Sequence, residues 1–296
     1  MKPGAFQYFR PTSLVEAIDL VDEYHDSGKI LAGGQSLVPV LNFRLSSPEQ
    51  LIDINQVPEL RGYRVRDGVV RMGALTRHRE LLSTAELRTD APLLPVVAPF
   101  IGHPQIRSMG TLGGSLSHAD PSAELPGAVL ALEATLIAVS KQGERRIPAA
   151  EFFQGFFTTA LEGDEILAAV EFPVAARRQG VAFDEVAARH GDFALAGAGA
   201  IVTLADDNTI ADAKISAISL GDVPIRLPEA EKLVIGQRPA PDLLAEVKVA
   251  VQDTVSPIAG HKASQAYKKR AGAALAARAI QRAWENAQAT AKGSAA

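Results

Sequence analysis

Two short glycine-rich segments carry the residue types that bind phosphate groups. The second glycine segment is residues 110–115, GTLGGS, and the first, far upstream, is residues 32–36, AGGQS. Adjacent glycines let a backbone approach a ligand closely and turn its N–H groups toward an anion. The neighbouring hydroxyl and amide side chains add further donors. We therefore expect the two segments to grip a diphosphate from two sides.

The glycine pairs must be weighed against plainer interpretations. A single pair is more often part of an ordinary turn than of a binding site. Two pairs with hydroxyl neighbours, each after an apolar run, favour a ligand. Residues 197–199, GAG, do not complete a dinucleotide fingerprint, because Val202 stands where the third glycine belongs. We interpret them as small residues inside a strand.

Metal binding has little support in the sequence. His118 and Asp120 are two residues apart, but two ligands make a poor site and no HExxH pair occurs. We interpret them as polar contacts along a ligand loop or a subunit surface.

Composition excludes several classes of function. The chain has 296 residues, of which 30 are basic and 34 acidic, for a net charge of −4. This balance gives no electrostatic case for nucleic acid. With no cysteine, the chain cannot carry a disulfide or a cysteine-bound iron–sulfur cluster. No apolar run is long enough to span a bilayer and the N-terminus has no signal-like region, so we expect a cytoplasmic protein.

The periodicity predicts elements that position the glycine segments. A strand at 29–32 should deliver the first segment into a short helical or irregular stretch at 36–43, an order that places free backbone donors at a helix start. Thr12 or Ser13 should cap a helix, with Glu16 placed to complete a capping box from Ser13. Thr76 should cap another helix. The remaining expectations up to residue 172 are strands at 51–54, 68–76, 133–140 and 166–172, and helices at 93–101 and 125–132.

A composition shift at 173–180 marks a domain boundary. Beyond it we expect an antiparallel sheet with strands at 182–188, 195–205 and 211–220, and a hairpin turn at 206–208. Helices should follow at 228–235, 243–251 and 263–289. The predicted fold class is α+β.

At this point the chain resembles a known family. The stretches AGGQSLVPVLNFRL, LIDIN and IGHPQIRSMGTLGGSLSHADPSAELP resemble the FAD-binding medium subunit of the molybdenum hydroxylases, the family of xanthine oxidase and carbon monoxide dehydrogenase. Later pieces, GDEIL, EFP, RHGDF and SLGDVP, extend the likeness over nearly the whole chain. The resemblance implies a two-part FAD-binding domain of the vanillyl-alcohol oxidase (PCMH) type over 1–175, divided at about residue 56. It also implies a C-terminal α/β domain over 176–290 and a disordered tail over 291–296.

The resemblance also implies a set of cofactor-binding residues and no catalytic or metal-binding residue. The glycine segments would hold the FAD diphosphate, Ile101 and Leu167 would pack near the flavin, Glu124 would be an acidic contact, and residues 189–193 would approach the isoalloxazine. The full expected set is Ala32, Gly33, Gly34, Gln35, Ser36, Leu37, Ile101, Thr111, Gly113, Gly114, Ser115, His118, Glu124, Leu167, Arg189, Asp192 and Phe193. Many relatives have a lysine near the flavin pyrimidine edge, where our alignment puts Glu185. Either Arg189 takes the part of that lysine or the local register differs.

The function implied by the resemblance is electron relay. A small partner subunit with [2Fe-2S] clusters would pass electrons to FAD on this chain, and FAD would pass them to an external acceptor. A large partner subunit with a molybdenum cofactor would oxidise the substrate, in a dimer of heterotrimers. One alternative is a self-contained FAD-dependent oxidase or reductase acting on a small organic substrate, for which no convincing acid or base is visible. The other is a scaffold without flavin, against which the intact glycine segments speak.

Overall fold

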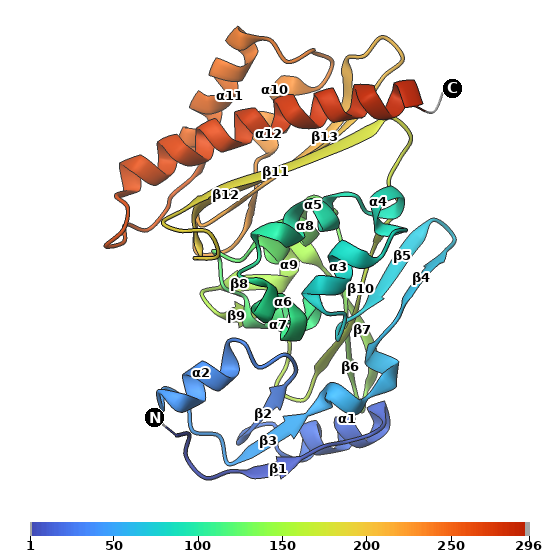
Figure 1. Ribbon diagram of the computed structural model, residues 1–296, viewed down its shortest axis with the longest axis vertical. Coiled ribbons are helices and arrows are strands. Elements are labelled where there is room, and N and C mark those ends of the chain that lie inside the picture. The colour runs from blue at the N-terminus through green and yellow to red at the C-terminus, as the bar shows by residue number, and fades with distance from the viewer. Residues whose placement is uncertain (1, 294–296) are drawn as a thin grey trace.

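The structure, a computed structural model, describes residues 2–293. Three parts follow one another along its longest axis, with the N-terminal part at one end and the C-terminal part at the other (Figure 1). Among residues 2–293, no helix is both long enough and apolar enough to cross a membrane. The structure agrees with the α+β class predicted from the sequence.

The N-terminal part is a small parallel sheet with two helices. Strands β1 (Gln7–Phe9), β3 (Gln50–Asp53) and β2 (Gly28–Leu31) pair in that order. Helix α1 (Leu14–Glu23) begins after Ser13, whose hydroxyl accepts from the backbone N–H of Glu16. Ser13 therefore caps the helix as predicted. The second hydrogen bond of the capping box differs, because the Glu16 carboxylate accepts from the N–H of Thr12, at 2.8 Å, and not from that of Ser13. Helix α2 (Leu37–Asn42) and the turns η1 (Ile54–Gln56) and η2 (Pro58–Leu60) complete this part.

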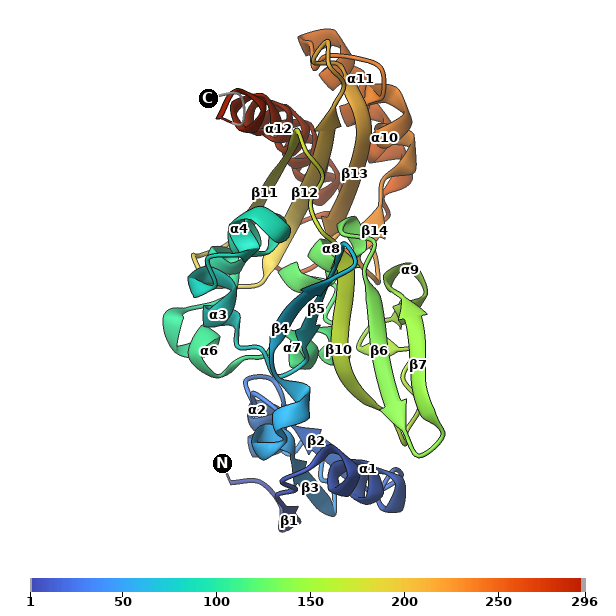
Figure 2. The same ribbon diagram turned by 90° about the vertical axis from the view of Figure 1, so that its right-hand side faces the viewer.

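The middle part is an antiparallel sheet with helices packed against it (Figure 2). The strand order is β4 (Tyr63–Arg66), β5 (Val69–Gly73), β10 (Ile166–Pro173), β6 (Thr135–Ser140) and β7 (Gly143–Pro148). The other elements of this part are α3 (His78–Ser83), α4 (Leu87–Asp90), α5 (Leu93–Val97), η3 (Ala98–Phe100), α6 (Pro104–Met109), α7 (Leu112–His118), α8 (Glu124–Ala131), α9 (Ala149–Phe152), β8 (Phe153–Gly155) and β9 (Thr158–Thr159). Their apolar side chains form one buried core that includes Leu112, Leu116 and Val170.

Two predictions for this part were wrong in detail. The Thr76 hydroxyl donates to the carbonyl of Gly73 at 2.7 Å, and α3 begins only after Arg77. Thr76 therefore closes a turn and does not cap the helix. The helix expected at 93–101 is divided into α5 and η3, and Pro104 begins α6. A proline is tolerated at the first helical position because that N–H has no partner within the helix.

The C-terminal part is an antiparallel sheet covered by helices. Strands β11 (Gln179–Ala187), β12 (Ala194–Leu204), β13 (Ile210–Ile218) and β14 (Ile225–Arg226) pair in sequence order, and residues 206–208 form the predicted hairpin turn. Residues 197–199 lie inside β12, as expected. Helices α10 (Pro228–Val234) and α11 (Pro241–Thr254) precede α12 (Gln265–Gly293). The expected disordered tail at 291–296 is wrong for 291–293, which are helical, and residues 294–296 lie outside the described residues.

The middle and C-terminal parts share a core. Val181, Phe183 and Ile218 pack in the same buried cluster as residues of the middle part. A Cβ added to Gly127 of α8 would lie 2.5 Å from Ile218 Cγ2, and one added to Gly197 of β12 would lie 2.7 Å from Ile218 Cγ1. Because both positions are glycine, α8 and β12 can pack closely against Ile218. The junction of the two parts is therefore a packed interface.

Candidate cofactor site between two glycine segments

The two glycine segments lie against each other. A Cβ added to Gly33 would lie 2.5 Å from the Met109 carbonyl oxygen and 2.9 Å from Gly110 Cα, and one added to Gly114 would lie 3.8 Å from Ala32 Cβ. A side chain at residue 33 would therefore force the segments apart. The structure thus brings together two stretches that are far apart in the sequence: the loop between β2 and α2, and the start of α7.

The first segment presents a row of free backbone donors. Within the described part of the chain, the N–H groups of Gly33, Gly34, Gln35, Ser36 and Leu37 have no hydrogen-bond partner. Gly34 has φ of +72°, a conformation that suits glycine, and the Gln35 side chain donates to the Gly33 carbonyl at 2.9 Å. Consecutive donors on a half-buried turn suit an anion with several oxygens, such as a diphosphate.

The second segment differs from its prediction, because its donors are already used. It is the first turn of α7, and Thr111 caps this helix by accepting from the Gly114 N–H at 3.1 Å. The N–H groups of Leu112 and Gly113 donate to the carbonyls of Thr76 and Ala74, each at 2.8 Å, and that of Ser115 donates to the Thr111 carbonyl. The expectation that this segment offers free N–H groups is therefore wrong.

Glycines in the second segment serve close packing. A Cβ added to Gly113 would lie 2.4 Å from Ala74 Cβ, and one added to Gly110 would lie 2.7 Å from His78 Nδ1. His78 is buried, which lowers its pKa to about 4, and its Nε2 lies 2.9 Å from the Thr111 carbonyl. At neutral pH this histidine is uncharged, and it supports the segment from behind.

A polar bridge that the sequence did not reveal joins the two segments. Asn55 donates from its side chain to the carbonyl of Ala32, and Arg77 donates to the side-chain oxygen of Asn55 and to the carbonyl of Met109. The sequence suggested only a turn at Asn55. Nothing in one sequence signals this bridge, because it depends on which loops meet in three dimensions.

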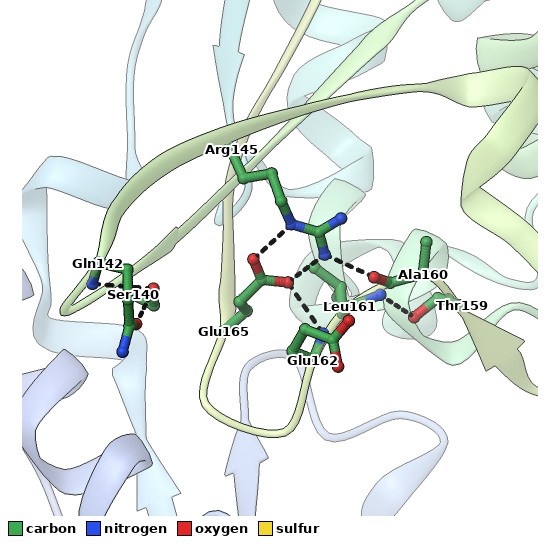
Figure 3. A network of polar contacts seen from close by, with 8 residues as sticks. All are labelled: Ser140, Gln142, Arg145, Thr159, Ala160, Leu161, Glu162 and Glu165. Carbon is green, nitrogen blue, oxygen red and sulfur yellow. Dashed lines mark hydrogen bonds and ion pairs between the residues drawn. The ribbon is translucent and has the colours of Figure 1, made fainter.

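Ile101 and Leu167 lie in the same buried core as Leu112 of the second segment. Leu167 belongs to β10, and Glu165 just before it fixes the start of this strand. Arg145 of β7 donates to both carboxylate oxygens of Glu165, at 2.7 and 2.6 Å, and to the carbonyl of Ala160 (Figure 3). These hydrogen bonds hold the pKa of Glu165 below its usual value although the side chain is buried.

Two carboxyl groups meet at the junction of the middle and C-terminal parts. Glu124 begins α8 and is only 8% exposed, and burial, reinforced by Asp120, raises its pKa to about 7. Glu185 lies on β11, and burial, followed by repulsion from Glu124 and Asp184, raises its pKa to about 8. Its Oε2 is buried without a hydrogen-bond partner within residues 2–293. The raised pKa values mean that this pair holds a proton near neutral pH.

His118 lies apart from the glycines of its own segment. It is in the last turn of α7, where its ring centroid lies 5.0 Å from that of Phe157. Burial lowers its pKa, although Asp120 opposes the shift. The structure therefore does not bring His118 together with Gly113 and Gly114, which lie at the opposite end of the helix.

The loop at 189–193 meets the middle part beside α6. The ring of His190 lies 6.1 Å from that of His103, and a Cβ added to Gly191 would lie 2.4 Å from the His103 ring. Asp192 pairs with Lys262 at 3.1 Å, Arg189 is exposed, and Phe193 is 64% exposed. The C-terminal part thus places this loop next to His103, the residue just before α6. Helix α6 in turn ends directly before the second glycine segment.

Comparison with known proteins gives a consistent result over the whole chain. Residues 4–175 match the family described as FAD binding domain in molybdopterin dehydrogenase, and residues 181–283 match the family described as CO dehydrogenase flavoprotein C-terminal domain. The sequence is 40% identical over 291 residues to the 6-hydroxypseudooxynicotine dehydrogenase complex subunit alpha of Paenarthrobacter nicotinovorans, with 98% of each chain covered. It is 39% identical over 284 residues to the caffeine dehydrogenase subunit beta of Pseudomonas sp. strain CBB1, with 96% of each chain covered.

The fold matches a solved structure equally well. A chain of the carbon monoxide dehydrogenase from Hydrogenophaga pseudoflava that lacks the Mo-pyranopterin moiety of its molybdenum cofactor superposes with a TM-score of 0.94. The two sequences are 31% identical, and the match covers 97% of this chain and 99% of that chain.

Proposed function

Because the chain belongs to the family of FAD-binding medium subunits of molybdenum hydroxylases, we propose that it is the electron-transfer flavoprotein subunit of such an enzyme. The observation that carries this function is the row of free N–H groups at Gly33–Leu37, held against the second glycine segment. When bound, FAD accepts electrons and passes them on one or two at a time. The part of this chain is to hold the diphosphate and to orient the flavin.

The residues that hold FAD form three groups in this proposal. The N–H groups of the first segment bind the diphosphate, and Thr111, Gly113, Gly114 and Ser115 supply the wall against which it lies. Buried Ile101 and Leu167 would pack near the flavin. The remaining residues of the proposed site are His118, Glu124, Arg189, Asp192 and Phe193.

Besides a role for Arg189 or a different local register, there is a third explanation for the absence of the lysine that many relatives have near the flavin. The neutral carboxyl of Glu185 itself takes the part of that lysine. A protonated carboxylic acid can donate a hydrogen bond to an electron-rich ring, which a carboxylate cannot do. We include Glu185 in the proposed site on this ground.

The chain works with partners in this proposal. It has no cysteine, so the [2Fe-2S] clusters that feed the flavin lie on a small partner subunit and the molybdenum cofactor on a large one. We propose a cytoplasmic dimer of heterotrimers. We also propose that residues 1–175, with a division near residue 56, form the FAD-binding domain and that 176–290 form the second domain.

Flavin content tests the proposal. The full chain is purified alone and together with its partner subunits, and the visible spectrum and the FAD released on denaturation are measured. We expect about one FAD per copy of this chain in the complex, and bleaching of the flavin on addition of substrate only when the partners are present. Absence of flavin from both preparations would contradict the proposal, and turnover of an organic substrate by the chain alone would indicate a self-contained oxidase or reductase.

A matched pair of glycine variants ties the flavin to the site. Gly33→Ala places a methyl group in the space of the Met109 carbonyl, whereas a Cβ at Gly260 meets open space. We expect Gly33→Ala to raise the dissociation constant for FAD about tenfold or more, equivalent to about 1.4 kcal/mol of binding free energy, and so to lower the FAD content, and Gly260→Ala to retain it. Equal FAD content in the two variants would refute the assignment of the first segment.

A further inference from the structure

A continuous chain of hydrogen bonds crosses from one glycine segment to the other. It starts at the Ala32 carbonyl, which accepts from Asn55 Nδ2 at 2.7 Å. Asn55 Oδ1 accepts from Arg77 Nη2 at 2.6 Å, and Arg77 Nη1 donates to the Met109 carbonyl. The side chains of Asn55 and Arg77 therefore connect the backbone of the first segment to that of Met109, the residue immediately before the second segment.

Each end of this connection is itself fixed. Asn55 is held by Asp53, whose Oδ1 accepts from the Asn55 backbone at 2.9 Å and from its side chain at 2.6 Å. The hydroxyl of Tyr8 donates to the other oxygen of Asp53. The side-chain amide of Asn55 therefore has one orientation, with its oxygen directed toward Arg77.

Arg77 is anchored to the second segment by its backbone. It forms an isolated antiparallel bridge with Thr111, flanked by a bond from the His78 N–H to the Gly110 carbonyl at 3.0 Å. Glu80 accepts from the Arg77 N–H at 2.6 Å. Burial, followed by the charge of Arg61, lowers the pKa of the Arg77 guanidinium, and this group remains charged at neutral pH.

We propose that Arg77 and Asn55 are positioning residues that fix the spacing between the two glycine segments and so set the affinity of the chain for the FAD diphosphate. This inference rests on the proposed function. The first segment leaves the N-terminal sheet and the second begins a helix of the middle part. Apolar packing, at Gly33 and in the core that Ile52 shares with Leu75 and Ile166, brings the two parts together, and the bridge adds directional hydrogen bonds that fix the spacing of the segments. A site whose walls are held at the bound spacing binds more tightly, because less ordering is required on binding.

Variants at both ends of the bridge test the proposal in the complex of the full chain with its partners. FAD is removed, and its rebinding is followed by flavin fluorescence. We expect Arg77→Met and Asn55→Ala each to weaken FAD binding about tenfold or more, since hydrogen bonds to a charged group are among the stronger ones. The double variant should bind FAD with about the same affinity as the single variant that binds FAD less tightly, because either change breaks the same connection.

Two further variants separate geometry from charge. Arg79→Met removes a neighbouring exposed cation that makes no hydrogen bond within the described residues, and we expect it to bind FAD like the parent chain. Arg77→Lys keeps the charge but cannot serve two acceptors in the planar geometry of a guanidinium, so it should resemble Arg77→Met. Parent-like binding by Arg77→Met, additive losses in the double variant, or full rescue by lysine would overturn the proposal.

Amide hydrogen exchange of the full chain without FAD gives an independent measurement. In Arg77→Met and Asn55→Ala, the hydrogen-bonded amides of Val38, Val40 and Gly110, which lie within or next to the two segments, should exchange faster, while those of β12 keep their protection. Unchanged exchange at these three amides would refute the bridge as a spacer. Because no flavin is involved, this result stands or falls separately from the proposed function, and Asn55→Ala remains available if Arg77→Met does not fold.

Discussion

At the scale of single residues, the same residue type has different tasks in the two glycine segments. Gly33 and Gly34 lie in a segment whose N–H groups are free, whereas Gly113 is glycine because Ala74 lies against it. The sequence located both segments from their composition. It could not separate donors from packing positions, because that difference depends on the acceptors in residues 74–76, which only the fold brings near.

The carboxyl pair at the domain junction has a testable effect on stability. Burial and the neighbouring carboxylates raise the pKa of Glu185 to about 8 in the folded chain, from an ordinary value of 4.5. Between pH 4.5 and pH 8 the native state keeps a proton on Glu185 that the unfolded state has released. The contribution of Glu185 to the free energy of unfolding is therefore fully present below pH 4.5 and is lost as the pH rises through about 8. The chain should therefore be less stable at pH 9 than at pH 5.

Replacing Glu185 by glutamine removes this loss. We expect Glu185→Gln to raise the free energy of unfolding at pH 9 by on the order of 2 kcal/mol, a figure reduced because the group is partly solvated. At pH 5 the change should be small. Denaturant unfolding of the flavin-free chain at both pH values provides the measurement, with exposed Glu151→Gln as the control, and an equal effect at both pH values would refute the buried proton.

At the scale of elements, the predictions succeeded where apolar periodicity was strong. The positions of β2, α2, β12, β13 and α12 were predicted to within a few residues. Strands β4, YRVR, and β7, GERRIP, were not predicted, because they are arginine-rich and mostly exposed. Their strand state is imposed by pairing with β5 and β6, and the local sequence does not show this pairing.

The cap of α7 is the element-scale feature with the clearest energetic effect. Thr111 is buried, and its hydroxyl accepts from the Gly114 N–H at the start of the helix. Thr111→Val keeps the shape and removes the acceptor, so we expect a loss of about 1 kcal/mol in the free energy of unfolding. Chemical denaturation measures the loss, and Thr111→Ser, which restores an acceptor, is the control. A loss of equal size in the serine variant would show that packing of the methyl group, and not capping, explains the change.

At the scale of the whole molecule, the chain cannot be divided cleanly at its compositional boundary. The shift at 173–180 was found from the sequence, but the shared core around Ile218 was not, because contacts between distant segments leave no local pattern. Val181, Phe183 and Ile218 belong to the cluster that also contains Leu116 and Val129.

Truncation tests this dependence. Residues 1–175 expressed alone would expose the apolar surface that these three side chains cover, so we expect a product that aggregates or unfolds without a cooperative transition. Coexpression with residues 176–296 should restore a soluble pair that unfolds cooperatively. Calorimetry and size-exclusion chromatography give the comparison. A cooperative transition of 1–175 alone, at a temperature close to that of the full chain, would show that the shared core contributes little.

The first turn of α7 forms its hydrogen bonds entirely within the protein, and this has a consequence for cofactor binding. Since Thr111, Thr76 and Ala74 already accept every N–H of that turn, this wall of the site is complete as soon as the chain has folded, and only the donors at 33–37 await a ligand. The hydrogen bonds of this wall do not involve the cofactor, so we expect the wall to keep its shape when FAD is removed and a removed cofactor to find half of its site already formed.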